Sequence, residues 1–200
     1  MDAVTGQGGT RRFDAAYYSR FYGRGGAHDR RRISHLASGV HSLAAWWGVR
    51  IGSVLDVGSG IGMWRDWYAH NHPRVKVTSV DVSEHACARW GHLLRDISQW
   101  TPEREHDLVI CHSVLQYLDD RRAASAIGNL ASGCRHLLYL EVPTIEDFSG
   151  IIDPSATDME VHRRTGRWYR TRLSRHFVQA GAGLWMKRDS VPLYELERAT

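Results

Sequence analysis

The stretch Ser53-Val-Leu-Asp-Val-Gly-Ser-Gly-Ile-Gly-Met-Trp64 decides the fold expected for this chain. Its first part holds the apolar residues Val54, Leu55 and Val57, which predict a buried strand. Three glycines follow at every second position, and residues 63–68 continue at helical spacing. The stretch therefore predicts a strand, a glycine turn and the start of a helix, an arrangement in which a small ligand can lie against the backbone.

Two acids near this turn favour a particular kind of ligand. Asp56 lies two residues before Gly58, where a carboxylate repels a pyrophosphate but accepts hydrogen bonds from a cationic amine. Residues 75–81 predict a second strand that ends in Asp81, about where such folds bind the two hydroxyls of a ribose. The dinucleotide pattern would place a small residue where this chain has Met63. These features indicate an amino acid joined to a nucleoside without phosphates.

With these residues in place, the chain resembles the class I methyltransferases that use S-adenosylmethionine. The family's first motif is similar to Leu55-Asp56-Val57-Gly58-Ser59-Gly60-Ile61-Gly62. Its ribose-binding acid falls on Asp81 and its adenine-side acid on Asp96, whereas its fourth motif is matched only in the general shape of residues 107–118. The resemblance covers roughly residues 40–200. It implies an α/β, Rossmann-like sheet of seven mostly parallel strands, with helices on both faces and a C-terminal antiparallel hairpin.

The resemblance also implies S-adenosylmethionine as the cofactor and a set of residues that bind it. These are Asp56, Gly58, Ser59, Gly60, Gly62, Asp81, Val82, Asp96, Ile97, Cys111 and Tyr18. A structural metal is not expected, because the three cysteines have no metal-like spacing and an odd count. Free thiols are the expectation for them.

Strand and helix patterns alternate along the chain, which predicts a parallel sheet. Strands are expected at about 53–57, 75–81, 93–97, 107–111 and 136–142. Helices are expected at about 29–47, 63–71, from 84, and at 119–131, with Ser83 as an N-cap. Residues 173–180 are expected to be helical and to lead back into the sheet. Residues 184–188 and 191–196 are expected to pair as the final hairpin.

The composition, 42% hydrophobic and 24% charged over 200 residues, suits one globular domain. No run approaches the roughly 18 apolar residues of a membrane span, and residues 1–10 lack the order of a secretory signal. The cytoplasm is therefore the expected location. We expect residues 1–47 to form a helical segment, and residues 48–200 to form the S-adenosylmethionine-binding methyltransferase domain, with an acceptor-region insertion at about 143–168.

The N-terminal segment is rich in aromatic residues. Those at positions 13, 17 and 21 share one helical face, so packing against the domain is one interpretation. A lid is the other, because many relatives in the resembled family carry an aromatic segment that folds over the cofactor. Tyr18 or Tyr22 would then cover the ligand. The glycines at 23–26 predict the end of this helix.

Candidates for catalysis follow the fourth and fifth strands, because ligands lie beyond the carboxyl ends of a parallel sheet. His112 suits a general base, since its ordinary pKa of about 6.5 lies near working pH; alternatively, it packs beside the adenine or ribose. Glu141 would bind or deprotonate the acceptor, or orient an arginine. Methyl transfer mainly needs an aligned nucleophile. Further acceptor contacts are expected from Tyr22, Tyr117, His162, Arg163 and Trp168.

The function expected is methyl transfer from S-adenosylmethionine to an oxygen or nitrogen of a small molecule. Residues 111–114 lack the motif with which enzymes acting on nucleic-acid base amines resemble one another. One alternative is an RNA or protein methyltransferase, because arginines cluster at 24–32 and 163–175 and the net charge is +4. A second alternative is a non-catalytic module that binds the nucleoside.

Overall fold

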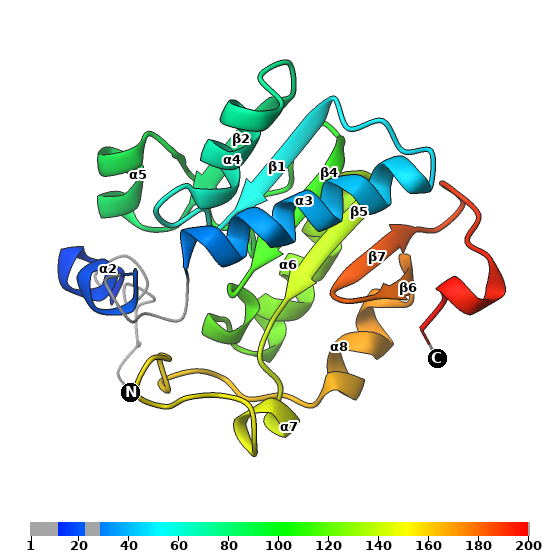
Figure 1. The fold of residues 1–200 in the computed structure, drawn as a ribbon. Coiled ribbons are helices and arrows are strands. Elements are labelled where there is room, and N and C mark those ends of the chain that lie inside the picture. The colour runs from blue at the N-terminus through cyan, green and yellow to red at the C-terminus, as the bar shows by residue number, and fades with distance from the viewer. Residues whose placement is uncertain (1–11, 23–28, 200) are drawn as a thin grey trace.

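The computed structural model describes residues 12–22 and 29–199 of the chain. Its strands within these ranges are β1 (Ser53–Val57), β2 (Lys76–Asp81), β3 (Leu93–Leu94), β4 (His106–His112), β5 (Cys134–Glu141), β6 (Phe177–Gly181) and β7 (Leu184–Lys187). They form one sheet in the order β3-β2-β1-β4-β5-β7-β6 (Figure 1). Strands β1 to β5 pair in parallel, and β7 pairs antiparallel with β5 and β6. The predicted fold class is therefore confirmed.

Helices cover both faces of this sheet (Figure 1). They are α2 (Ala15–Tyr22), α3 (Arg30–Trp46), α4 (Met63–Asn71), α5 (Glu84–Trp90), α6 (Asp120–Gly133), α7 (Ile145–Phe148) and α8 (Gly166–Leu173). The helices predicted at about 29–47 and 119–131 correspond to α3 and α6. The glycine break predicted at 23–26 lies outside the described residues.

Two apolar cores lie on opposite faces of the sheet because successive strand residues point to opposite sides. In β1, Val54 packs with α3 and α4, and its neighbour Leu55 packs with α6 and α8. In β4, Leu108 and Val109 divide between the cores in the same way. All four side chains are fully buried, so β1 and β4 form the centre of the molecule.

The final hairpin forms earlier in the chain than the sequence indicates. The expected helix at 173–180 is wrong, because α8 has already ended and β6 begins at Phe177. The chain then reverses through Gly181, Ala182 and Gly183, which all have positive φ. Residues 191–196, predicted as a strand, form no pairing with β7 and end in a short 3-10 turn. The position of the hairpin turn is therefore set by Gly181 and Gly183, which form it with Ala182.

The carboxyl ends of β1, β2, β4 and β5 meet at one edge of the sheet, and the connections beyond them form the candidate site. Ser83 begins α5 at this edge, as predicted, because its hydroxyl accepts a hydrogen bond from the Ala86 amide at 3.0 Å. The third strand, predicted over 93–97, is limited to Leu93–Leu94. The chain leaves β3 early, and this places Asp96 in a loop beside the site.

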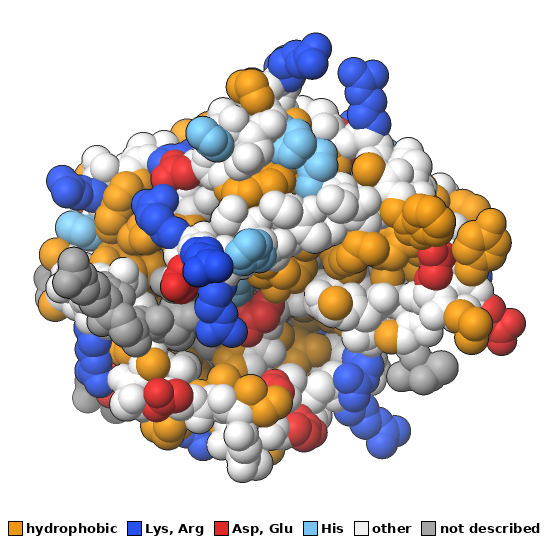
Figure 2. Space-filling model, viewed as in Figure 1, with side chains coloured by type: hydrophobic (Ala, Val, Ile, Leu, Met, Phe, Trp, Pro, Cys, Tyr) orange, Lys and Arg blue, Asp and Glu red, His pale blue; other side chains and the backbone are white. Residues whose placement is uncertain are grey.

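The surface carries both charge signs. On the face shown in Figure 2, Lys and Arg side chains are dispersed among acidic and apolar ones. Of the helices in residues 12–22 and 29–199, none is both long enough and apolar enough to cross a membrane.

Candidate functional site

The glycine turn after β1 is shaped so that side chains from other elements lie against its backbone. Gly58, Gly60 and Gly62 have φ values of 66°, 57° and 78°, which L-residues with a side chain adopt only under strain. A Cβ added to Gly58 would lie 2.3 Å from Cγ2 of Val114, and one added to Gly60 would lie 3.0 Å from the hydroxyl oxygen of Tyr22. Val114 and Tyr22 thus pack directly on the backbone of the turn, and neither glycine could carry a side chain without displacing them.

The two acids predicted at this turn are both buried. The side chain of Asp56 is 2% exposed and accepts a hydrogen bond from the Ser59 hydroxyl. Burial raises the pKa of Asp56 to about 6. Asp81 accepts hydrogen bonds from the backbone amides of Gly60 and Ser83, each at 2.8 Å, and burial raises its pKa as well. These carboxylates place negative charge where a cationic or hydroxyl-bearing ligand would be stabilised.

His92 also holds the glycine turn, a role that no motif in the sequence indicates. Its side chain is 6% exposed, with Nδ1 2.9 Å from the hydroxyl of Ser79 and Nε2 3.0 Å from the carbonyl oxygen of Gly60. Burial lowers the pKa of His92. In its neutral form the ring accepts from Ser79 at one nitrogen and donates to Gly60 at the other. His92 therefore connects β2 to the turn.

Asp96 lies in the loop after β3 and is bound to an arginine of α6. Its carboxylate accepts hydrogen bonds from the amide and hydroxyl of Ser98 at 2.9 and 2.7 Å, and Arg122 approaches it to 2.6 Å. Burial alone would raise the pKa of Asp96, but these partners outweigh it and lower the pKa. Arg122 is a second residue whose place in the site no sequence motif indicates.

Gly58, Gly60, Asp81, Asp96 and Arg122 line a cavity of about 100 Å³. Nine of the predicted site residues line it. They are Tyr18, Tyr22, Gly58, Gly60, Asp81, Val82, Asp96, Ile97 and Tyr117. Four other predicted cofactor residues, Asp56, Ser59, Gly62 and Cys111, are absent from its lining. Cys111 is wholly buried in the core behind the cavity, and burial raises its thiol pKa.

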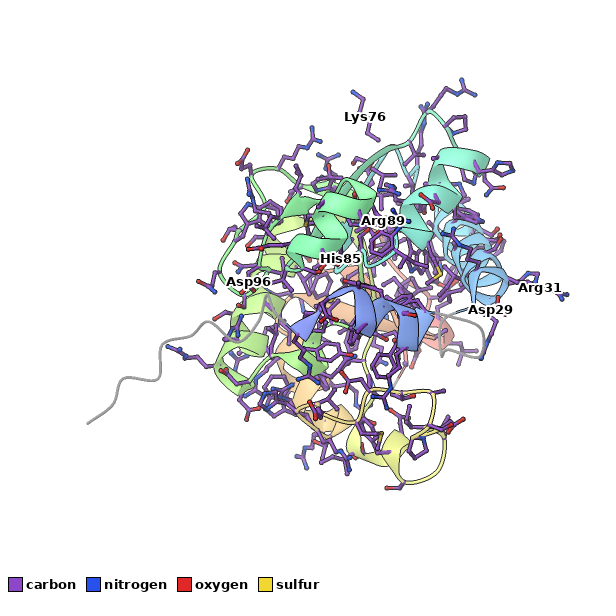
Figure 3. The ribbon with its side chains drawn as sticks, turned by 90° about the vertical axis from the view of Figure 1, so that its left-hand side faces the viewer. Asp29, Arg31, Lys76, His85, Arg89 and Asp96 are labelled. Carbon is purple, nitrogen blue, oxygen red and sulfur yellow. The ribbon has the colours of Figure 1, made fainter. Side chains whose placement is uncertain are left out.

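Side chains of α2 line this cavity, and Figure 3 shows α2 beside α5, the helix that carries His85. The ring of Tyr18 stacks on His85 of α5 with centroids 5.8 Å apart, and it contacts Trp90 edge-on at 5.1 Å. The hydroxyl of Ser83 donates to the carbonyl of Phe13 at 2.5 Å. Burial raises the pKa of Tyr18, so its hydroxyl stays protonated. The aromatic segment thus both packs on the domain and covers the cavity.

A second, larger cavity of about 450 Å³ adjoins the first. The two share four lining residues: Tyr17, Tyr22, Ser113 and Tyr117. The hydroxyls of Tyr17 and Tyr117 are hydrogen-bonded to each other at 2.8 Å, and this contact ties α2 to the loop after β4. A group held at the glycine turn and a molecule in the second cavity would meet at these shared residues.

Both predicted catalytic residues line the second cavity. Nε2 of His112 lies 3.1 Å from Oε2 of Glu141, and the Ser113 hydroxyl donates to the same oxygen at 2.6 Å. On the other side of the imidazole ring, the indole N–H of Trp64 donates to Nδ1 at 3.2 Å. Ser113 has φ of 57°, a strained value that often marks a functional site. The structure thus brings His112 and Ser113 into contact with the same oxygen of Glu141.

Three residues predicted to contact the acceptor lie away from both cavities. His162 donates its backbone amide to the carbonyl of Gln116 at 2.8 Å, and Arg163 lies over the ring of Phe148 at 4.5 Å. The ring of Trp168 stacks with guanidinium groups on α8 and before it. None of the three lines either cavity. Sequence position alone did not separate the inner from the outer part of the segment 143–168.

Some arginines of the cluster at 163–175 form contacts within the protein. Arg164 is 4% exposed and donates to Asp120 at 2.7 Å, to the carbonyl of Leu115 and to the hydroxyl of Tyr169. Arg172 stacks on Trp168 at 3.7 Å. These contacts leave fewer guanidinium groups for binding an acidic partner. Across the described part of the chain, no group of three His, Cys, Asp or Glu side chains is placed to hold a metal ion.

Comparison with known proteins agrees with this geometry. Residues 55–136 match the family model described as a methyltransferase domain. A trans-aconitate 2-methyltransferase of Methylobacterium radiotolerans is 31% identical over 124 residues, which are 58% of this chain and 45% of that protein. The chain therefore spans less than half the length of this curated relative.

Solved structures share the fold at low identity. The magnesium protoporphyrin IX methyltransferase of Synechocystis, solved with bound S-adenosylmethionine, has a TM-score of 0.54 and 19% identity, covering 85% of this chain and 86% of that one. The plantazolicin methyltransferase, solved with S-adenosylhomocysteine, has a TM-score of 0.62 and 14% identity, covering 82% and 68%.

The family match and the shared fold both point to methyltransferases. The match covers residues 55–136, less than half of the chain, and the solved structures share its fold at under 25% identity. The predicted resemblance to S-adenosylmethionine-dependent methyltransferases is supported by the match over residues 55–136, and two of the similar structures were solved with S-adenosylmethionine or S-adenosylhomocysteine.

Proposed function

We propose that this protein transfers a methyl group from S-adenosylmethionine to an oxygen or nitrogen of a small molecule. The observation that carries the proposal is the pair of adjoining cavities, which share Tyr17, Tyr22, Ser113 and Tyr117. One cavity lies against the glycine turn and its acids, and the other contains the His112–Glu141 pair. Methyl transfer requires two bound molecules aligned end to end, which this arrangement permits.

The residues present fit the cofactor that the family uses. Asp81 would accept hydrogen bonds from ribose hydroxyls, Asp96 and Ile97 would bind the adenine, and Asp56 would favour the cationic amino group near the turn. When bound, S-adenosylmethionine supplies an electrophilic methyl group. The protein's own part is to hold the acceptor in line and to exclude water, because the transfer itself needs no acid or metal.

A small acceptor is favoured over a macromolecule for two reasons. The second cavity is of a size that suits a metabolite-sized ligand, and the later arginine cluster is partly used in internal contacts. The names of the similar proteins also point to small acceptors, namely trans-aconitate, magnesium protoporphyrin IX and plantazolicin.

The same proposal gives α2 the role of a lid, within the N-terminal helical segment expected over 1–47. Tyr18 and Tyr22 line the first cavity from α2, and Tyr22 lies against Gly60 of the turn. Tyr18→Ala should therefore weaken S-adenosylhomocysteine binding, whereas Tyr194→Ala, at a side chain 80% exposed and remote from both cavities, should not. Equal affinity for the two variants would remove α2 from the binding site.

The test of the function is a transfer assay with S-adenosylmethionine labelled in its methyl carbon. The purified protein is incubated with a panel of small alcohols, phenols, carboxylic acids and amines, and separately with bulk tRNA. Label in a small acceptor, lost in Asp81→Ala, is the expected result. Label only in tRNA would favour the RNA alternative. Cofactor binding without transfer to any acceptor would favour the non-catalytic module.

A further inference from the structure

The second cavity contains a buried hydrogen-bond acceptor that lacks a donor. Gln116 is 5% exposed and lines the cavity, and its Oε1 has no hydrogen-bond partner among the described residues. Its backbone is fixed, because its carbonyl accepts from the His162 amide at 2.8 Å. Buried polar atoms in native proteins nearly always have partners, so an unmatched one on a residue that lines a cavity points to a ligand that donates.

The charged groups of this cavity are mainly carboxylates. Glu141, Asp153 and Asp158 line it, whereas Arg32 is the one Lys or Arg among its described lining residues. Asp158 is neutralised by Arg12 at 2.9 Å. Arg32 is exposed at the start of α3, and Glu141 lies at the junction with the first cavity through its hydrogen bond to Ser113. The charged group nearest to the junction of the two cavities is therefore the carboxylate of Glu141, which is negative.

The nitrogen of His112 that faces Glu141 acts as a hydrogen-bond donor and not as an acceptor. An indole N–H can only donate, so the bond from Trp64 occupies the lone pair of His112 Nδ1. The neutral ring then carries its proton on Nε2, which lies 3.1 Å from Glu141. His112 in this arrangement orients the carboxylate, and Glu141 is the group that can receive a proton from the acceptor.

A carboxylate is a weak base, so it removes a proton more readily from a methyl acceptor whose acidic group has a low pKa. Taking ordinary pKa values of about 4.3 for a glutamate and about 10.4 for an alkylammonium group, transfer of the proton is uphill by about 6 pK units. An aliphatic hydroxyl is a far weaker acid than an alkylammonium group, so transfer of its proton to a carboxylate is more strongly uphill still. An ammonium group also supplies several N–H donors, enough for both Glu141 and Oε1 of Gln116.

We propose that the methyl acceptor is a primary or secondary amine that enters as its ammonium form and is held by Glu141 and Gln116. This inference rests on the proposed methyltransferase function. The ammonium proton passes to the Glu141 carboxylate, which leaves a neutral amine. The nitrogen lone pair then forms the new bond to the methyl carbon, and the electron pair of the broken carbon–sulfur bond remains on sulfur. The products are a methylated ammonium ion, charge +1, and neutral S-adenosylhomocysteine.

The experiment uses matched pairs of acceptors that differ only in the reacting group. Benzylamine is paired with benzyl alcohol and cyclohexylamine with cyclohexanol, and trans-aconitate serves as the anionic acceptor. Label transfer from S-adenosylmethionine is measured for each, and S-adenosylhomocysteine binding is measured in parallel by calorimetry. We expect amines to be methylated at least about tenfold faster than their alcohols.

Two variants and a control connect the result to the residues. Glu141→Gln should lower amine methylation by at least about tenfold, and Gln116→Met should raise the KM for the amine while the melting temperature stays equal or rises. Both should bind S-adenosylhomocysteine as the parent does. Glu103→Gln, an exposed acid ahead of β4 that lines neither cavity, is the matched control and should behave as the parent.

The outcomes separate the two proposals. Preference for the alcohols or for trans-aconitate overturns the amine assignment and leaves the methyltransferase function standing. Cofactor binding without methylation of either amine also overturns the amine assignment. Failure to bind S-adenosylhomocysteine at all contradicts the proposed function itself.

Discussion

Replacing Gly58 by alanine tests whether the backbone of the glycine turn is as constrained as the structure shows. At φ of 66°, a residue with a Cβ costs about 1–2 kcal/mol. The new Cβ would also lie 2.3 Å from Cγ2 of Val114, and overpacking of this kind costs about 1–3 kcal/mol. Gly58→Ala should therefore lower the free energy of unfolding by about 2–5 kcal/mol.

The two contributions can be separated by a double-mutant cycle. Val114→Ala removes the methyl group that meets the new Cβ but leaves the strained φ. The double variant should therefore recover about 1–3 kcal/mol relative to the sum of the single changes. Urea unfolding followed by circular dichroism gives the four free energies.

The control is Gly39→Ala, at an exposed position in the middle of α3, where an added Cβ meets nothing within 4 Å. This variant should gain stability, by up to about 1 kcal/mol, because glycine is a poor helix former. A Gly58→Ala variant within about 0.5 kcal/mol of the parent, or strict additivity in the cycle, would refute the reasoning.

Three further predictions concern buried polar groups of the site. Burial raises the pKa of Asp56 to about 6, above its ordinary value near 3.9. The charged form of Asp56 therefore lowers the free energy of unfolding above pH 6. This loss of stability fades as the pH falls toward 4, because the carboxyl group becomes protonated in the folded protein. Asp56→Asn should therefore raise the unfolding free energy of the ligand-free protein by about 3 kcal/mol at pH 8 and change it little at pH 4; a gain equal at both pH values contradicts this. Asp81→Ala should weaken S-adenosylhomocysteine binding by roughly 1–3 kcal/mol in calorimetry, and unchanged affinity removes Asp81 from the site. His92→Phe leaves Ser79 and the Gly60 carbonyl without their partner and should cost about 1–3 kcal/mol in thermal unfolding; a neutral effect shows that the link to the turn is dispensable.

The central part of the fold could be predicted because its signals are local. The apolar run of β1, the glycines after it and the acid at the end of β2 occur in order within about thirty residues. The hairpin was misplaced because residues 177–181 form a strand only through pairing with β7, and Asp189 offered a competing turn, with a positive φ of its own. Long-range pairing overrode the local pattern there.

The residues of the candidate site also fall into two groups: those that local sequence signals predict and those that depend on contacts with distant parts of the chain. Carboxylates and glycines that line the first cavity could be found from their spacing, since they follow directly after strands. His92 and Gln116 could not, because their roles depend on contacts with residues far away in the chain, such as His92 with Gly60 and Gln116 with His162. In the segment 143–168, which residues turn inward depends on packing, and the predicted His162, Arg163 and Trp168 lie outside the cavities.

The most direct test of the account is a calorimetric titration of the purified protein with S-adenosylmethionine, S-adenosylhomocysteine and NAD. The account predicts micromolar binding of the first two and no binding of NAD, because buried Asp56 and Asp81 beside the turn favour a cationic nucleoside and repel a pyrophosphate. Binding of NAD in place of S-adenosylmethionine, or binding of neither, would contradict it.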